Sequence, residues 1–242
     1  MSIIAIYSDI HANLEAYREV VRDMDAHPHD AEVCLGDVVG YGPQPQECCD
    51  LLRQRGATVV QGNHERGMLN IYQMAPFNQP AKDSLRRTRQ MIDDATFDWL
   101  ISHPRSAVVD GCRFVHGVPP DDVNGYLWKY ENNVGELFAR FGERICFVGH
   151  THDLMRFVEN REGVSGRLPL PEGETLLNPE ERHIVNVGAV GQPRDGDNRA
   201  KYALYDTERH SVTMRFITYD IKKTADLIRA KGFHRAFADR LW

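Results

Sequence analysis

Short apolar runs alternate with amphipathic stretches along the first part of the chain. Residues 3–7 form an apolar run, which predicts a buried strand. Residues 14–25 place apolar side chains at helical spacing, and Asn13 just before them can cap a helix. The same pattern predicts strands over 32–35 and 57–60 and a helix around 45–55. This strand–helix alternation predicts a parallel or mixed α/β sheet.

The rest of the chain changes from a helical to a strand-rich pattern. Residues 65–102 are mostly helical in pattern, with breaks at Pro76 and Pro80. Short strands then recur, and they are predicted over 106–109, 112–115, 145–148, 154–158, 183–187, 201–206 and 211–217. A helix over 221–231 is predicted to close the chain. The pattern predicts an α/β fold, a two-layered mixed β-sheet sandwich flanked by α-helices, as one domain over 1–242.

Composition narrows the class of protein without changing this picture. Of the 242 residues, 42% are apolar and 26% are charged, as in ordinary globular proteins. No apolar run approaches the ~18 residues of a membrane-spanning helix, so no membrane partner is expected. The net charge of −6 argues against a nucleic-acid binder with a broad basic face. Five cysteines without CxxC spacing, and an N-terminus without a signal-peptide pattern, predict a cytoplasmic location.

Side chains that can bind metal follow five of the predicted strands, usually beside a glycine. In chain order they are Asp9 and His11, Asp37, Asn63 and His64, His116, and His150 and His152. The carboxyl ends of strands in an open α/β sheet line one crevice, so we expect these side chains to converge there. Without His64, the set offers seven oxygen or nitrogen ligands and no thiolate. Seven ligands are too many for one tetrahedral ion and suit two ions that share a carboxylate.

The ligand types also indicate which ions and which reaction to expect. Mixed imidazole and carboxylate ligands favour Mn, Fe, Zn, Co or Ni over Mg or Ca, which prefer shells of oxygen alone. Two ions about 3.5–4 Å apart are the usual means of in-line displacement at phosphorus. The residues therefore predict a dinuclear transition-metal site for phosphoester chemistry.

Four ordered motifs carry a resemblance to a known family. They are Asp9-x-His11, Gly36-Asp37, Gly62-Asn63-His64-Glu65 and Gly149-His150-x-His152. In this order they resemble the calcineurin-like metallophosphoesterase superfamily, and the resemblance runs from Ser8 to about Asp197. The sequence segments 9–13, 36–43 and 188–197 are similar to those of the superfamily's compact prokaryotic phosphodiesterase branch. That branch includes enzymes that act on phosphodiesters and some that act on dinucleoside polyphosphates.

The resemblance implies a role for each motif residue. The first metal ion would be bound by Asp9, His11 and His152. The second would be bound by Asn63, His116 and His150, with Asp37 as the bridge between the ions. His64 would protonate the leaving oxygen or bind the phosphoryl group, and histidine titrates near neutrality. The implied reaction is attack on phosphorus by a hydroxide that bridges the ions, without a covalent phosphoenzyme.

The loop after Asp37 departs from two branches of the family. Serine/threonine protein phosphatases have an aspartate and an arginine where this chain has Gly40 and Tyr41, which argues against a phosphoprotein substrate. Purple acid phosphatases have a tyrosine ligand at the position of Gly40. A protein phosphatase, a nuclease and a non-catalytic scaffold of the same fold stay as alternatives. The presence of His64 argues against the scaffold.

Three residues are candidates for substrate binding. Arg194 either completes a plain turn or binds phosphate at the mouth of the site. Tyr41 either packs in its loop or lines the pocket, and Asn63 is a candidate for substrate as well as for metal. We expect the helical segment 66–102, near the active site, and the aromatic loop 119–130 to select a small phosphoester or nucleotide substrate. The oligomeric state is left open.

Overall fold

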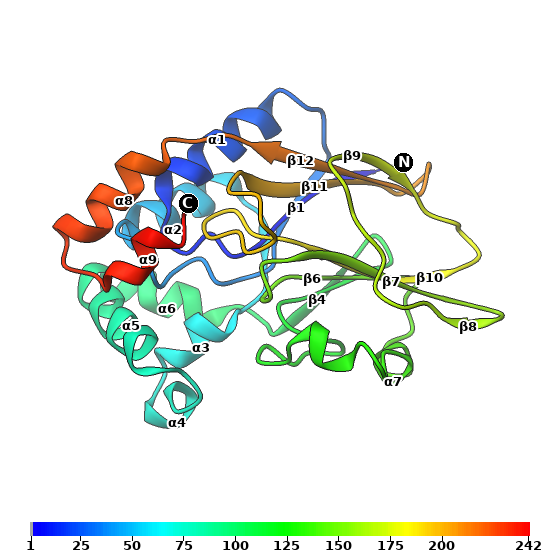
Figure 1. The fold of residues 1–242 in the computed structure, drawn as a ribbon, viewed down its shortest axis with the longest axis horizontal. Helices are drawn as coiled ribbons and strands as arrows, with labels where there is room; N and C mark the ends of the chain where they lie inside the picture. The colour runs from blue at the N-terminus through cyan, green and yellow to red at the C-terminus, as the bar shows by residue number, and fades with distance from the viewer. Residues whose placement is uncertain (1) are drawn as a thin grey trace.

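The computed structural model describes residues 2–242 and places two β-sheets against each other, with most of the helices at one end (Figure 1). The strands are β1 (Ile3–Tyr7), β2 (Ala31–Cys34), β3 (Thr58–Val59), β4 (Ser106–Val109), β5 (Cys112–Val115), β6 (Ile145–Val148), β7 (Leu154–Asn160), β8 (Gly163–Val164), β9 (Gly173–Leu176), β10 (Arg182–Val187), β11 (Ala200–Asp206) and β12 (Ser211–Ile217). The helices are α1 (Leu14–Asp25), α2 (Pro45–Arg55), α3 (Asn63–Gly67), α4 (Ile71–Met74), α5 (Gln79–Met91), α6 (Asp94–Ser102), the 3₁₀ helix η1 (Leu127–Tyr130), α7 (Gly135–Phe138), α8 (Ile221–Ala230) and α9 (Arg235–Asp239).

Each sheet has six strands and combines parallel with antiparallel pairs. The first sheet has the order β3-β2-β1-β11-β12-β9, and the second has the order β4-β5-β6-β10-β7-β8. Strands β1, β2 and β3 run parallel to one another, as do β5, β6 and β10. Each sheet therefore presents several carboxyl ends on the same side. The predicted α/β fold, a mixed two-layered sandwich flanked by helices, is confirmed.

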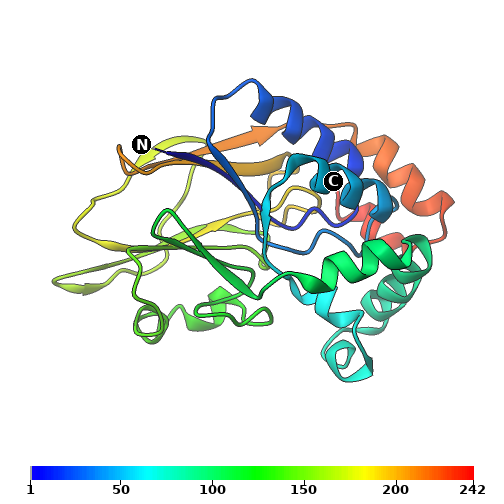
Figure 2. The same ribbon diagram turned by 180° about the vertical axis from the view of Figure 1, so that it is seen from behind.

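Strand β1 is buried on both faces because its residues alternate between two cores. Ile4 and Ile6 pack between the sheets, in a core that also holds Phe147 of β6. Ala5 and Tyr7 point the other way, into a core that they share with Tyr17 of α1, among others. The first sheet is thus covered by α1 on its outer face and by the second sheet on its inner face (Figures 1 and 2). This packing fixes the end of β1, from which the first site residues emerge.

Several elements differ in detail from the sequence pattern. Pro80 lies in the first turn of α5, where a missing N–H is tolerated, and Asn78 caps that helix by accepting from the N–H of Ala81. A further helix, α9, follows the helix that was predicted to close the chain. The elements β8, β9, η1 and α7 were not predicted, because these short segments lack the apolar run that marks the equally short β6.

Two further observations concern the cysteines and membrane-spanning helices. All five cysteines are buried and free, as small core residues. Burial raises the pKa of Cys34 and of Cys146, so both thiols stay protonated at neutral pH. Among residues 2–242, no helix combines the length and the apolar character needed to cross a bilayer.

Candidate metal centre

The seven predicted metal ligands all lie in loops at one end of the two sheets. In chain order they are Asp9 and His11 after β1, Asp37 after β2, Asn63 at the start of α3, His116 after β5, and His150 and His152 after β6. All seven are buried. The structure brings these residues together because the parallel strands of both sheets end on the same side.

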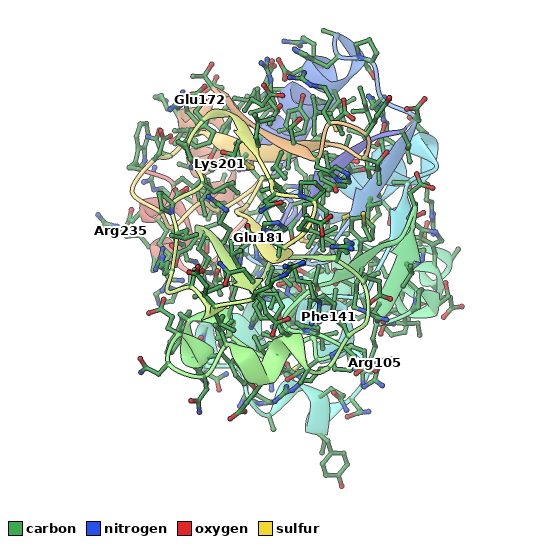
Figure 3. All side chains as sticks on the ribbon, turned by 90° about the vertical axis from the view of Figure 1, so that its right-hand side faces the viewer. Arg105, Phe141, Glu172, Glu181, Lys201 and Arg235 are labelled. Atoms are coloured by element: carbon green, nitrogen blue, oxygen red, sulfur yellow. The ribbon has the colours of Figure 1, made fainter. Side chains whose placement is uncertain are left out.

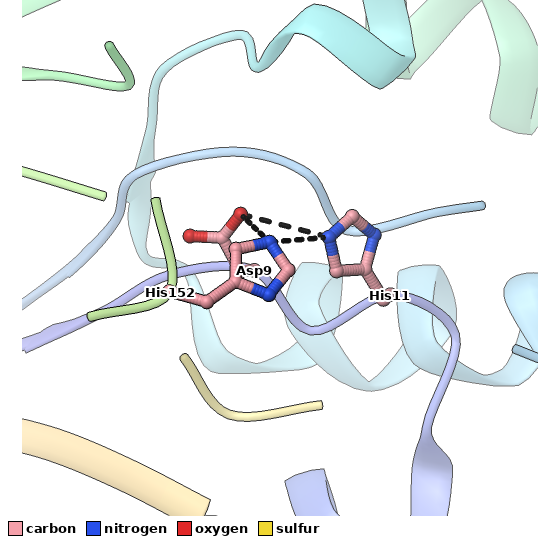
Figure 4. A group of neighbouring side chains, drawn as sticks. All are labelled: Asp9, His11 and His152. Carbon is pink, nitrogen blue, oxygen red and sulfur yellow. Dashed lines mark hydrogen bonds and ion pairs between the residues drawn. The ribbon is translucent and has the colours of Figure 1, made fainter. Parts of the chain in front are cut away.

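Asp9, His11 and His152 form a first group (Figure 4). Nε2 of His152 lies 3.1 Å from Oδ1 of Asp9 and 3.1 Å from Nε2 of His11. Nε2 of His11 lies 3.6 Å from the same carboxylate oxygen. Two residues of this group come from the first sheet and one comes from the second, so the group forms only when the sheets pack.

A second group lies beside the first and contains Asp37, Asn63, His116 and His150. Nε2 of His116 lies 3.3 Å from Oδ2 of Asp37, 3.0 Å from Oδ1 of Asn63 and 3.1 Å from Nδ1 of His150. The same Oδ2 of Asp37 lies 3.7 Å from Nε2 of His11 in the first group. Asp37 therefore stands between the two groups, where a bridging ligand has to be.

Backbone N–H groups orient both carboxylates. Oδ2 of Asp9 accepts from the N–H of His150 at 2.9 Å, and Oδ1 of Asp37 accepts from the N–H of His64 at 2.8 Å. The other oxygen of each carboxylate is left to face the imidazoles. For Asp9 that oxygen, Oδ1, is buried and has no hydrogen-bond partner among the described residues. Such an atom is costly to bury unless a cation or a proton binds it.

Backbone carbonyls orient three of the histidines. The pairs are Nδ1 of His11 with O of Val39 at 3.1 Å, Nδ1 of His116 with O of Leu35 at 2.8 Å, and Nδ1 of His152 with O of Gln192. A carbonyl oxygen only accepts, so each Nδ1 carries a proton and donates it. In its neutral form each of these rings presents a bare Nε2 to the centre, as metal-binding histidines do.

Ring nitrogens face one another in both groups, and in the first group both are bare when the rings are neutral. The two Nε2 atoms of His11 and His152 lie 3.1 Å apart, and Nε2 of His116 lies 3.1 Å from Nδ1 of His150. Two lone pairs at this distance repel unless a cation or a proton lies between them. The donors are imidazole, carboxylate and amide, a set that suits two transition-metal ions. The residues present therefore fit the predicted dinuclear centre.

Electrostatics in the ion-free chain agree with this reading. Burial disfavours a charged imidazole, and it lowers the pKa of His150 to about 3 and that of His152 to about 4. Burial also acts on His116, but the charge and hydrogen bond of Asp37, with the charges of Asp9 and Glu65, together outweigh it and raise the pKa of His116 to about 9. The carboxylates of the centre thus favour positive charge beside them.

The backbone at the centre is in an unusual conformation. Five of the seven predicted ligands have positive φ values: Asp9 at 56°, His11 at 47°, Asp37 at 50°, His150 at 65° and His152 at 61°. Non-glycine residues rarely adopt this left-handed conformation, and such residues cluster at functional sites. The surrounding hydrogen bonds hold these loops in a shape that a free loop would not choose.

Glu65 is a buried carboxylate that sequence reasoning left without a role. It accepts from the N–H groups of Asp37 at 2.9 Å, Val38 at 2.9 Å and Gly62 at 2.8 Å. Burial, together with the charge of Asp37, raises the pKa of Glu65 to about 7. Glu65 thus ties the loop of Asp37 to the start of α3. Its place in the Gly62–Glu65 motif was the available signal, since a glutamate at the third position of a helix can bond back to the cap.

His64 lies beside the two groups, in a ring of aromatic side chains. Its Nε2 is 3.9 Å from Oδ2 of Asp37, and its Nδ1 has no hydrogen-bond partner among the described residues. Its ring meets the ring of Tyr41 at 4.5 Å and that of Phe77 at 5.1 Å, both edge to face. Burial lowers the pKa of His64, although the charge of Asp37 opposes this shift. Geometry alone does not separate His64 from the ligands, since it also lies close to His11 and Asp37.

A cavity of about 380 Å³ opens above the two groups. All three candidates for substrate binding line it: Tyr41, Asn63 and Arg194. Its other walls come from the 66–102 and 119–130 segments, and they are Pro76, Phe77, Asn78, Ala81, Asn124, Tyr126 and Lys129. Sequence reasoning had named Tyr126 but had missed Phe77, Asn124 and Lys129. They lie in the two segments that were expected to select the substrate, but no motif singles out the individual residues.

Comparison with known proteins agrees with the fold. A family model described as the calcineurin-like phosphoesterase superfamily domain matches residues 1–210. The uncharacterized protein MJ0912 of Methanocaldococcus jannaschii is 34% identical over all of this chain and 98% of its own length. A metallophosphoesterase from Sphaerobacter thermophilus has a similar structure, with a TM-score of 0.86 and 33% identity over 99% of this chain and 98% of its own.

A more distant structure shows the same fold. The hypothetical protein PH1004 of Pyrococcus horikoshii has a TM-score of 0.79 over all of this chain and 98% of its own, at 17% identity. The family match covers every predicted ligand, and the fold extends beyond the matched residues to the end of the chain. This chain belongs to the calcineurin-like phosphoesterase superfamily.

Proposed function

We propose that this protein is a dinuclear metal-dependent hydrolase whose substrates are small phosphodiesters and nucleotides, including dinucleoside polyphosphates. One observation carries the proposal. Two groups of inward-facing nitrogen and carboxylate ligands, with Asp37 between them, form the floor of a cavity lined by Arg194 and Lys129. With two cations bound on it, such a floor between cationic walls would suit a phosphate ester, whose charge resides on its non-bridging oxygens.

In this proposal Asp9, His11 and His152 would hold one ion. Asn63, His116 and His150 would hold the other, and Asp37 lies between the two groups. Ions of Mn, Fe, Zn, Co or Ni bound there would supply Lewis acidity toward water and positive charge toward the phosphoryl oxygens. The protein's own contribution is orientation, because the carboxylates and three imidazoles are each fixed by a backbone hydrogen bond.

Arg194, Lys129, Tyr41 and Asn63 are proposed to bind the substrate. The guanidinium of Arg194 can form paired hydrogen bonds with phosphate oxygens, and Lys129 adds a second cation on the wall. Lys129 also lies 5.1 Å from the ring centre of Tyr126, so its charge sits beside an aromatic surface. A nucleobase can stack on such a surface, which favours nucleotides over simple monoesters.

The main test is hydrolysis of bis(4-nitrophenyl) phosphate by protein loaded with Mn²⁺. Asp37→Asn keeps the side-chain shape but removes the charge between the two groups, so we expect it to lose bound metal and to lower kcat at least a hundredfold. Asp153→Asn is the control, because Asp153 follows His152 but belongs to neither group. Equal activity in wild type and Asp37→Asn would refute the metal mechanism.

A second test concerns His64, which we propose acts on the leaving oxygen. His64→Ala should slow esters with poor leaving groups more than esters with good ones, because only poor leaving groups depend on protonation. Metal content should stay at two ions per chain, as expected from the role in the family resemblance. A uniform loss across a series of leaving groups would instead indicate binding of the phosphoryl group.

A substrate panel separates this function from the alternatives. Metal-loaded protein is offered bis(4-nitrophenyl) phosphate, a diadenosine tetraphosphate, a single-stranded RNA and a phosphoserine peptide at equal concentration. We expect the diester and the dinucleotide to be hydrolysed and the peptide to be left intact, since Gly40 and Tyr41 occupy the protein-phosphatase positions. Preferred cleavage of the RNA would favour a nuclease, and no hydrolysis of any substrate would favour a scaffold.

A further inference from the structure

Lys201 is a lysine whose side chain is completely buried. It is the second residue of β11, and its side-chain exposure is 0%. Figure 3 labels its position in the sheet. Its Nζ lies 5.0 Å from the ring centre of Phe216, and its N–H donates to O of Ala189 at 3.0 Å. Lysine is almost never fully buried unless its charge is paired, so this ammonium group is expected to have buried acceptors around it.

The three N–H groups of the Lys201 ammonium all donate to one loop, residues 193–199. Nζ donates to Oδ1 of Asp195 at 2.9 Å, to O of Arg199 at 3.0 Å and to O of Asp197. Three acceptors use the full hydrogen-bonding capacity of an ammonium group. The loop thus surrounds the ammonium group, which binds three oxygen atoms of the loop.

The segment just before this loop, residues 190–192, is hydrogen-bonded to the candidate metal centre. The N–H groups of Val190 and Gly191 donate to O of Ser8 and O of Asp9, at 2.9 Å and 2.8 Å. O of Gln192 accepts from Nδ1 of His152. The N–H of Arg194 then donates to O of His152 at 3.1 Å. Arg194 is therefore placed between an end fixed by the metal-binding loops and an end fixed by Lys201.

We propose that Lys201 is a positioning residue that holds the 193–199 loop so that Arg194 points into the cavity. Arg194 itself is exposed, and its guanidinium donates to Oε1 of Gln192, just before the loop, at 3.0 Å. The backbone that carries Arg194 therefore helps to set the direction of its side chain. The kinetic part of this inference rests on the proposed function, whereas the structural part does not.

The test replaces Lys201 by methionine, which keeps the apolar stem and removes the three donors. Hydrogen–deuterium exchange followed by mass spectrometry should show faster exchange at residues 193–199 in Lys201→Met. With bis(4-nitrophenyl) phosphate, KM should rise about tenfold, as expected when a charged hydrogen-bond donor loses its place, with a smaller change in kcat. In an Arg194→Ala background, Lys201→Met should have no further effect on KM.

Arg215→Met is the matched control. Arg215 lies on the neighbouring strand β12 and pairs with Asp23 at 2.9 Å and 2.7 Å, so its loss also removes an ion pair from the first sheet. It should lower stability without changing exchange at 193–199 or KM. If Lys201→Met does not fold, Asp195→Asn removes the loop carboxylate while leaving Lys201 its two carbonyl partners, and it should give a smaller change in the same direction.

Three results would overturn the proposal. They are unchanged exchange at 193–199 in both Lys201→Met and Asp195→Asn, an equal rise in KM in the presence and absence of Arg194, and the same changes in Arg215→Met. A wild-type protein without hydrolytic activity would refute the proposed function only, because the exchange measurement still tests whether Lys201 holds the loop.

Discussion

At the scale of single residues, the position of His64 depends on the absence of a side chain at Gly40. Gly40 has φ of +89°, and a Cβ built on it would lie 2.0 Å from Nδ1 of His64. Where the protein phosphatases of the superfamily have an aspartate, this chain has no side chain. The imidazole of His64 lies in the space left free, between Tyr41 and Phe77.

Gly40→Ala should therefore displace His64 while leaving the metal ligands in place. We expect kcat to fall about a hundredfold, since displacing a catalytic group by about 1 Å costs on that order. Metal content, measured by atomic absorption, should not change. Gly111→Ala is the control, because Gly111 also has a positive φ, +73°, but a Cβ there would meet nothing within 4 Å. Equal loss of kcat in both variants would mean that backbone strain, and not the contact with His64, is responsible.

At the scale of elements, α1 is joined to the first sheet by a charged contact as well as by its apolar face. Asp23 of α1 accepts from Arg215 of β12, at 2.9 Å and 2.7 Å, and from the hydroxyl of Tyr202 of β11 at 2.7 Å. Burial raises the pKa of Asp23, but these donors outweigh it, so the pKa lies below 3.8. The contact fixes the helix that follows the loop of Asp9 and His11.

The Asp23 contact predicts a pH-dependent stability. Because the folded-state pKa is lowered, the stabilisation is present above the unfolded-state pKa near 3.8 and is lost as the pH falls through the folded-state value. Asp23→Asn should lower the free energy of unfolding by about 1–2 kcal/mol at pH 7 and by much less near pH 3. Urea unfolding at both pH values measures this. The exposed Asp98→Asn is the control, and a difference that is the same at both pH values would contradict the prediction.

The sequence predicted the elements that carry periodicity and the site residues that carry motifs. Ile3–Tyr7 and Leu14–Asp25 have the predicted bounds, because an apolar run and an amphipathic face are local properties. Lys129, Phe77 and Lys201 were not predicted as site residues, because their roles depend on how distant loops meet. A buried lysine in a strand looks, in sequence, like any other polar residue of the chain.

At the scale of the whole molecule, the C-terminal helices reach the site although they lie beyond the family match, which ends at residue 210. Phe237 of α9 packs against Tyr41, with ring centres 4.7 Å apart, in a cluster that includes Phe233 and Leu241. The end of the chain thus supports one wall of the cavity. The single domain over 1–242 and the cytoplasmic location stay predictions from the sequence.

Phe237→Ala should affect substrate binding as well as stability. Removal of the buried ring is expected to lower the free energy of unfolding by about 3–5 kcal/mol and to raise KM severalfold, because Tyr41 loses its support. Leu241→Ala is the control, since it removes apolar volume from the same cluster at about 2–5 kcal/mol but leaves the ring under Tyr41. Thermal unfolding and steady-state kinetics measure both effects. A similar KM in the two variants would show that Tyr41 is held by its own loop.

The place of β1 in the first sheet has a consequence for biosynthesis. Strand β1 pairs with β2 on one side and with β11 on the other, and β11 is made only when most of the chain has left the ribosome. Until then one edge of β1 is open, and the second sheet, which supplies His116, His150 and His152, cannot pack fully on the first. We therefore expect a truncated chain that ends before Ala200 to bind metal no better than an unfolded one.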